Sequence, residues 1–245
     1  MPDAIFDHPR VAAVLDALDP DRSDLDTYVD LARRLGAADV LDVGCGTGIL
    51  ACRLAALGVR VTGVDPAAAS VAVGRGKPHA DPVTWIVGTA PDLLALPDQE
   101  GRYDLATMTA NVAQVFLEDD EWLATLRAVR TCLRSGGTLA FESRVPADRA
   151  WERWTEQLTR QVVDVEGEGP VEDWVDVVSV EGDLVTFASP TIFHADGERI
   201  DSVSTLRFRP EEELRRSVLA AGFAEVSVQD LPSAPGKGGL VLARA

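Results

Sequence analysis

The stretch LDVGCGTG, residues 41–48, decides how this chain folds. It contains the end of a short apolar run, Val40 to Val43, that predicts a strand, and residues 49–57 after it predict a helix that ends at Gly58. The glycines at positions 44, 46 and 48 lack a Cβ atom, so a ligand can approach the backbone N–H groups of the turn. A strand, a glycine-rich turn and a helix in this order predict a site for a nucleotide-like ligand.

The surrounding sequence alternates between predicted strands and predicted helices. Strands are expected over 59–64, 83–87, 103–109 and 138–142, helices over 67–73, 119–133 and 211–221, and a terminal strand pair over 224–230 and 239–243. Strands that alternate with helices imply a parallel, doubly wound sheet. The predicted fold class is therefore α/β, with residues 37–144 and 210–245 forming the sheet domain.

Two segments do not follow this alternation. Helical spacing at 9–19 and 25–35 predicts an N-terminal helical cap over residues 1–36. Residues 147–160 are expected to be helical, and 161–208 alternate apolar and polar residues with hairpin turns at 181–183 and 195–197. Residues 145–209 are therefore predicted to be an inserted helix plus an antiparallel β subdomain.

Composition argues against several classes of function. A formal net charge of -17 repels phosphate backbones, so nucleic acid is not expected as a partner. The three cysteines and three histidines have no metal-ligand spacing, so no metal is predicted. No apolar run approaches about eighteen residues, and the acidic start MPDAIFDHPR does not match a signal peptide. We expect no membrane partner and a cytoplasmic protein.

The spacing of the glycines distinguishes between two kinds of nucleotide site. A dinucleotide site has the pattern G-x-G-x-x-G, but here Ile49 occupies the last position and Gly48 comes one residue early. LDVGCGTG instead resembles motif I of the class I methyltransferases. VTGVDP (61–66), YDLATMTANV (103–112) and LRSGGTLAF (133–141) are similar to later motifs of that family and follow in the same order.

The resemblance implies a Rossmann-like methyltransferase fold, with seven strands, mostly parallel, and S-adenosylmethionine as the methyl donor. It implies that Asp42 organises the loop and the methionine end of the donor, and that Asp65 binds the ribose hydroxyls. Many relatives carry an acidic adenine contact where this chain has Thr89, and Asp92 is a second candidate there. The candidate cofactor-binding residues are Asp42, Gly44, Cys45, Gly46, Thr47, Gly48, Asp65, Pro66, Thr89, Ala90, Thr109 and Asn111.

A small-molecule acceptor, methylated on nitrogen or oxygen, is expected beyond the carboxyl ends of the strands, with the insertion as its lid. The candidate catalytic residues are Glu142, Arg144 and His194. Arg144 is a candidate clamp for an acceptor carboxylate or else half of a surface ion pair, and His194 is a candidate proton acceptor or else a solvated side chain. Asn111 either contacts a ligand or forms a turn.

Other features leave alternatives open. Tyr28, Arg22 and Asp24 are candidates for closing over the cofactor, or else caps and surface charges. The aromatic residues of the insertion are expected to form its own core rather than a lid over the acceptor. The main alternative function is a non-catalytic S-adenosylmethionine-binding or regulatory module, because Thr89 departs from the family pattern and no base is identified. A nicotinamide-dependent dehydrogenase is a third reading, and no oligomeric state is predicted.

Overall fold

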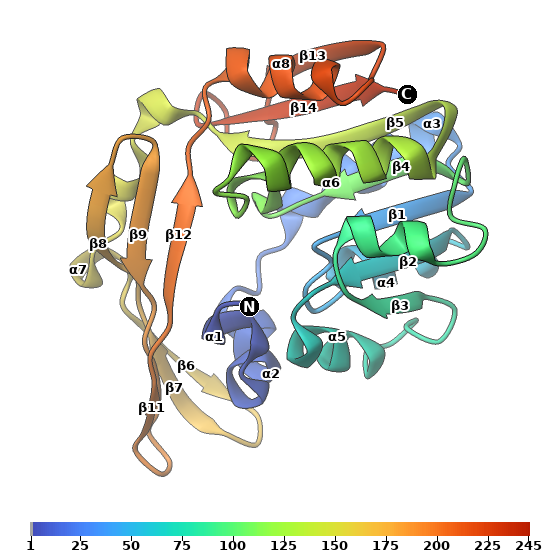
Figure 1. Cartoon of the computed structure of the whole chain (residues 1–245). Coiled ribbons are helices and arrows are strands. Elements are labelled where there is room, and N and C mark those ends of the chain that lie inside the picture. The colour runs from blue at the N-terminus through green and yellow to red at the C-terminus, as the bar shows by residue number, and fades with distance from the viewer. Residues whose placement is uncertain (1) are drawn as a thin grey trace.

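A computed structural model describes residues 2–245, and its centre is a seven-stranded sheet in the order β13-β14-β5-β4-β1-β2-β3 (Figure 1). The strands are β1 (Asp39–Val43), β2 (Arg60–Asp65), β3 (Thr84–Val87), β4 (Tyr103–Met108), β5 (Leu133–Arg144), β13 (Glu225–Asp230) and β14 (Gly238–Arg244). Strands β1 to β5 pair in parallel, and β14 runs antiparallel to both β5 and β13. The predicted α/β fold class, with seven mostly parallel strands, is confirmed.

Helices cover both faces of this sheet. The helices of the α/β domain are α4 (Ile49–Ala55), α5 (Ala68–Arg75), α6 (Asp119–Cys132), α8 (Glu211–Ala220) and the short 3-10 helices η2 (Ala90–Ala95) and η3 (Val112–Gln114). Buried residues of η2, α6 and α8 pack on one face, and α4 packs on the other together with α3 (Asp26–Leu35). Helix α6 buries Trp122, Leu126 and Val129, whose helical spacing puts them on one side of the helix.

The insertion consists of two antiparallel sheets. One contains β6 (Gln161–Val165), β7 (Gly169–Asp173), β10 (Thr191–Phe193) and β11 (Glu198–Ile200), and the other contains β8 (Asp176–Glu181), β9 (Leu184–Ala188) and β12 (Val203–Arg207). Gly182 and Gly197 have positive φ angles at the two predicted hairpin turns. The antiparallel character of the insertion is therefore confirmed.

The single helix expected over 147–160 is wrong. This stretch contains the 3-10 helices η4 (Pro146–Asp148) and η5 (Ala150–Arg153) and the four-residue helix α7 (Glu156–Thr159). Arg149 has a φ of 47°, which a continuous helix does not allow. Trp151 and Trp154 pack on Phe208, with ring centroids 4.7 and 6.0 Å away, whereas Leu158 is exposed. Packing among the aromatic rings outweighs the helical spacing and confirms that these tryptophans belong to the core of the insertion.

The N-terminal segment joins the insertion to the α/β domain. It contains α1 (Ala4–Asp7), α2 (Pro9–Leu18), the 3-10 helix η1 (Ser23–Leu25) and α3. Figure 1 shows α2 between the insertion and α5, and its residues Val11, Val14 and Leu18 pack on β7 and β10. On the other side, the Ser70 hydroxyl of α5 donates to the Phe6 carbonyl at 2.6 Å. Within residues 2–245, no helix has both the length and the apolarity needed to cross a bilayer.

Candidate functional site

The glycine loop between β1 and α4 has left-handed backbone at all three glycines. Gly44, Gly46 and Gly48 have φ angles of 69°, 52° and 74°. A Cβ atom on Gly44 would lie 2.5 Å from a Val112 methyl, and one on Gly48 would lie 2.1 Å from the Trp85 ring. A Cβ on Gly46 would meet nothing within 4 Å. The interpretation that all three missing Cβ atoms admit a ligand therefore needs correction, because at Gly44 and Gly48 they admit neighbouring side chains.

Asp65, at the carboxyl end of β2, is bonded to the glycine loop. Its Oδ2 accepts the Gly46 N–H and its Oδ1 accepts the Ala67 N–H, both at 2.8 Å. Burial raises the pKa of Asp65, and these two hydrogen bonds oppose that rise. A carboxylate has about four acceptor sites, so each oxygen keeps capacity for a further donor. Asp65 thus fixes the loop and remains able to accept hydrogen bonds from a ligand.

Asp42 lies in the sheet beneath the loop. Its side chain is only 1% exposed, and the Thr107 hydroxyl donates to its Oδ1 at 2.8 Å. Burial raises the pKa of Asp42 to about 7, the Thr107 hydrogen bond opposes the shift, and the negative charge of Asp65 adds to it. Asp42 is therefore placed where the family resemblance expects it, but in a setting that favours the neutral carboxyl.

The loop also contacts the N-terminal helices. The Thr47 hydroxyl donates to Asp16 Oδ1 of α2 at 2.6 Å, and the other oxygen of Asp16 pairs with Lys77. Cys45 is buried beside the same turn, and burial raises the pKa of its thiol. The contact between Asp16 and Thr47 was not predicted, because no local sequence pattern connects residues 31 positions apart.

The carboxyl end of β3 carries the predicted adenine contacts. It lies beside Asp65, since the Gly88 N–H donates to the Asp65 carbonyl at 3.0 Å. The Thr89 N–H and hydroxyl both donate to Asp92 Oδ2 at 2.7 Å, which lowers the pKa of Asp92. Asp92 is therefore the N-terminal cap partner of η2. Of the remaining predicted residues, Ala90 is buried, whereas Pro66 and Thr89 are exposed.

Two consecutive residues after β4 have strained backbone. Ala110 and Asn111 have φ angles of 52° and 63°, in the left-handed region that non-glycine residues rarely adopt. Such strain persists only where the surrounding structure imposes it, and it concentrates at functional sites. The turn directs the Asn111 N–H toward Glu142, where it favours the ionised carboxylate. Asn111 therefore forms a turn and lies at the site, while the preceding Thr109 is buried.

A cavity of about 540 Å3, here named the β5 cavity, opens at the carboxyl ends of β4 and β5. Its lining residues are Asp19, Arg22, Asp24, Ala110, Asn111, Glu142, Arg144, Asp148, Ala150, Arg153, Trp154, Leu231, Ser233, Ala234, Lys237 and Gly238. They come from the N-terminal segment, β5, the start of the insertion and the β13–β14 turn. The structure thus brings together Glu142, Arg144 and Asn111 with Arg22 and Asp24.

Glu142 is held in the wall of this cavity by Tyr28. The Tyr28 hydroxyl donates to Glu142 Oε2 at 2.6 Å, although the two residues are 114 positions apart. Burial raises the pKa of Glu142, while Tyr28 and the Asn111 N–H oppose the rise. Burial and the charge of Glu142 also raise the pKa of Tyr28 well above its usual range. Tyr28 therefore remains a hydrogen-bond donor that fixes this carboxylate.

Arg144 lies two residues further along the same strand, and none of the ion pairs among residues 2–245 involves it. One guanidinium nitrogen donates to Gln114 Oε1 at 3.1 Å, and the guanidinium lies 5.3 Å from the centroid of the Trp154 ring. Within the part of the chain that the structure describes, no carboxylate oxygen lies within 4.0 Å of its guanidinium. The alternative that Arg144 forms a surface ion pair is therefore wrong.

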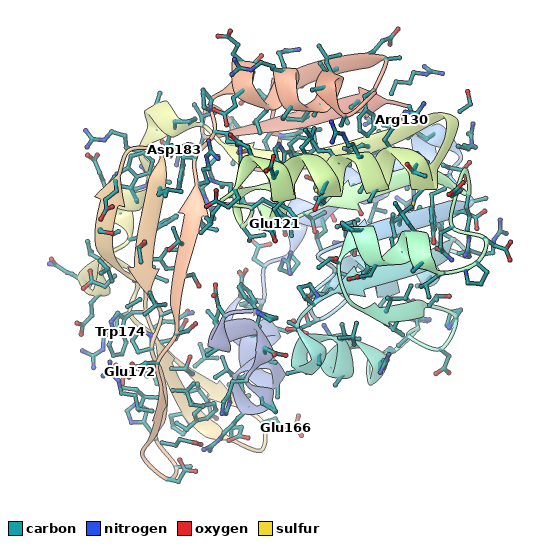
Figure 2. The ribbon with its side chains drawn as sticks, viewed as in Figure 1. Glu121, Arg130, Glu166, Glu172, Trp174 and Asp183 are labelled. Atoms are coloured by element: carbon teal, nitrogen blue, oxygen red, sulfur yellow. The ribbon has the colours of Figure 1, made fainter. Side chains whose placement is uncertain are left out.

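His194 lies apart from these residues. Its Nε2 is 2.8 Å from Glu172 Oε2, and Glu172 also pairs with Arg160. Figure 2 shows Glu172 in the insertion, away from the seven-stranded sheet. His194 does not line the β5 cavity, so the structure does not bring it to Glu142 and Arg144.

Comparison with known proteins agrees with this arrangement. Residues 40–137 match the family model described as a methyltransferase domain. The ubiquinone biosynthesis O-methyltransferase of Xanthomonas campestris is 37% identical over 137 residues, which is 54% of each chain. The chain thus spans about half the length of the curated relatives it matches.

Two solved structures share nearly the whole fold. The CcbJ methyltransferase of Streptomyces caelestis superimposes with a TM-score of 0.71 at 21% identity, covering 95% of this chain and 96% of that one. The amino pentose methyltransferase CalS10 of Micromonospora echinaspora gives 0.69 at 24% identity, covering 92% and 93%. Together with the strand order, these likenesses show that the chain has the fold of these two methyltransferases and that its residues 40–137 resemble a methyltransferase domain.

Proposed function

We propose that the chain transfers a methyl group from S-adenosylmethionine to a nitrogen or oxygen atom of a small-molecule acceptor. The observation that carries this proposal is the glycine loop, in which Gly46 borders open space directly beside the Asp65 carboxylate. The matched methyltransferase domain supports the reaction class. The size of the β5 cavity, about 540 Å3, supports a small acceptor.

In this proposal the residues around the loop hold the methyl donor. Asp65 accepts hydrogen bonds from the ribose hydroxyls through the capacity that its two backbone contacts leave free. The backbone from Gly44 to Gly48, with Asp42 beneath it, holds the methionine end together with Thr109 and Asn111. Pro66, Thr89 and Ala90 line the adenine end.

The donor, when bound, supplies a sulfonium methyl group that leaves by in-line displacement. The chain's own contribution is to position the acceptor and to exclude water, which can supply much of the acceleration of such a reaction. In the proposal Glu142 accepts a proton from an acceptor that must lose one, because a carboxylate with a raised pKa suits a base at neutral pH. Tyr28 keeps that carboxylate in place.

The domains have separate roles in this proposal. Residues 37–144 and 210–245 bind the donor, the N-terminal cap closes over it, and the insertion over 145–209 covers the acceptor. Trp154 and Arg153 of the insertion line the β5 cavity, which supports the role of lid. Two similar proteins support a small-molecule acceptor, since one is named for ubiquinone biosynthesis and the other for methylation of an amino pentose.

The experiment that tests the proposal is transfer of a labelled methyl group from S-adenosylmethionine to a panel of small amines and hydroxyl compounds. We expect labelled product with at least one acceptor, and we expect Glu142→Gln to lower kcat at unchanged S-adenosylhomocysteine affinity. Glu152→Gln, an exposed change outside the cavity, is the matched control and leaves kcat unchanged. Binding of the homocysteine product without transfer to any acceptor would instead support a binding or regulatory module.

A further inference from the structure

Arg144 is half-buried in the wall of the β5 cavity, and within the described residues 2–245 its guanidinium forms no ion pair. Arginine is rarely buried unless it is paired, because removing its charge from water is costly. The contacts that the structure does give it are a neutral amide oxygen of Gln114 and the face of Trp154. Neither contact neutralises the positive charge of Arg144, so its guanidinium remains able to bind an anion.

The nearest acid on the same strand does not supply that anion. Glu142 and Arg144 lie on the same face of β5, but the Glu142 carboxylate already accepts from Tyr28 and is turned toward the Asn111 N–H. The charges of Glu142 and Arg144 act on each other, but no ion pair within 4.0 Å forms between the two residues. The fold thus separates an acid and a base that could otherwise pair.

Four acids and four bases line the β5 cavity, and two of each are joined in ion pairs. Arg22 pairs with Asp24, and Arg153 pairs with Asp148. Of the lining bases, Arg144 and Lys237 are left without an ion pair within the described residues 2–245. Lys237 is close to Arg144 in the sheet, because Gly238 is the strand partner of Arg144 and the Lys237 carbonyl accepts the Val145 N–H at 2.8 Å.

We propose that the acceptor carries an anionic group, a carboxylate or a phosphate, which binds in the β5 cavity to the Arg144 guanidinium with Lys237 beside it. The proposal rests on the proposed function, since it takes this cavity as the acceptor site. The guanidinium fork binds two oxygens of such a group at once, and Trp154 fixes the plane of the fork. An anion there gives the half-buried Arg144 guanidinium an ion-pair partner, which the described residues 2–245 do not supply.

The test measures binding of three aromatic probes to the protein saturated with S-adenosylhomocysteine: benzoate, phenyl phosphate and the neutral benzyl alcohol. Calorimetry is expected to show that one or both anions bind more tightly than benzyl alcohol. Arg144→Gln is expected to weaken anion binding about tenfold or more, because a charge-assisted pair is lost. Lys237→Gln is expected to cause a smaller loss, about two- to fivefold, because Lys237 is exposed.

The controls distinguish the loss of anion binding from unfolding of the variant. Arg216→Gln removes the same charge from an exposed position on α8 outside the cavity and leaves anion binding unchanged. Benzyl alcohol binding and S-adenosylhomocysteine binding stay the same in Arg144→Gln. Should that variant fail to fold, Arg144→Lys keeps the charge without the fork and is expected to bind the anions several-fold more weakly than the wild type.

The results of this binding test can be told apart from those of the methyl-transfer experiment, because the binding test requires no methyl transfer. Preference for benzoate identifies a carboxylate, and preference for phenyl phosphate identifies a phosphate. Anions that bind no more tightly than benzyl alcohol, or that bind equally to wild type and Arg144→Gln, would overturn the proposal even if methyl transfer is observed. Anion binding without methyl transfer would support this subsite and count against the proposed reaction.

Discussion

At the scale of single residues, three buried carboxylates define the carboxyl edge of the sheet. Asp42, Asp65 and Glu142 are each 8% exposed or less, and burial raises the pKa of each. Each accepts hydrogen bonds from a specific partner: Thr107, the loop backbone and Tyr28. Ionising a buried carboxyl group lowers the free energy of unfolding, so each of these three residues destabilises the fold when it is charged.

Asp42 gives a pH-dependent prediction. Its pKa rises from 3.8 to about 7 on folding, so between these values the folded protein binds more protons than the unfolded chain. The free energy of unfolding therefore falls as pH rises from about 4 to above 7, by at most about 1.4 kcal/mol per pH unit. Asp42→Asn keeps the acceptor for Thr107 and removes the titration, so its urea-unfolding stability is expected to fall less over this range. Equal slopes for wild type and variant would contradict the account.

Asp65 gives a prediction about ligand binding. Asp65→Ala removes a buried acceptor and is expected to weaken S-adenosylhomocysteine binding by about 1–3 kcal/mol in calorimetry. Asp30→Ala, an exposed change on α3, serves as the control and leaves the affinity unchanged. Undiminished affinity in a folded Asp65→Ala protein would refute the assignment of the ribose contact.

Some of these residues could be predicted from the sequence, whereas others could not. Asp42 was a candidate because LDVGCGTG resembles motif I of the class I methyltransferases, and Asp65 because it ends the second strand and matches a later motif. The pairing of Tyr28 with Glu142 was not predicted, because it joins residues 114 positions apart and depends on how α3 packs. The same holds for Asp16 at Thr47 and for Lys237 beside Arg144. His194 was a candidate on residue type alone, and the structure pairs it with Glu172 in the insertion.

At the scale of elements, the loop between β1 and α4 divides its glycines into two kinds. Gly44 and Gly48 have no room for a Cβ, whereas Gly46 does. The spacing of the glycines does not reveal this division, because Val112 of η3 and Trp85 of β3 reach the loop from distant parts of the sequence. The prediction of one helix over 147–160 is wrong for a related reason, because the packing of Trp151 and Trp154 on Phe208 overrides their helical spacing.

Two alanine substitutions separate these roles. Gly46→Ala is expected to lower stability by only about 1 kcal/mol, the cost of a left-handed alanine, while it weakens S-adenosylhomocysteine binding because its methyl enters the open space. Gly48→Ala adds a clash with the Trp85 ring and is expected to lower the unfolding free energy by several kcal/mol. Thermal unfolding and calorimetry on both variants give the comparison. Equal stability losses would contradict the division of the glycines.

At the scale of the whole molecule, α2 connects the insertion to the α/β domain (Figure 1). Its Asp16 contacts the glycine loop, and its Arg10 contacts Glu168, Asp196 and Glu198 of the insertion. The Arg10 guanidinium also lies 3.9 Å from the centroid of the Phe193 ring. The same short helix thus touches both sides of the molecule.

Arg10 gives a prediction about the coupling of these two parts. Arg10→Gln is expected to lower global stability by only about 1 kcal/mol, because its partners are partly exposed. Hydrogen exchange is expected to increase over α2 and over the β10–β11 turn, which Arg10 connects. Arg33→Gln removes a single exposed ion pair on α3 and is the control. Exchange that is unchanged over both segments would show that α2 does not couple them.

The central claim is that the glycine loop and Asp65 belong to a class I methyltransferase rather than to a dinucleotide enzyme. Calorimetric titration of the wild-type protein with S-adenosylhomocysteine and, separately, with NADH tests it most directly. The account predicts that one S-adenosylhomocysteine binds per chain and that NADH does not bind. Binding of NADH without binding of S-adenosylhomocysteine would contradict it.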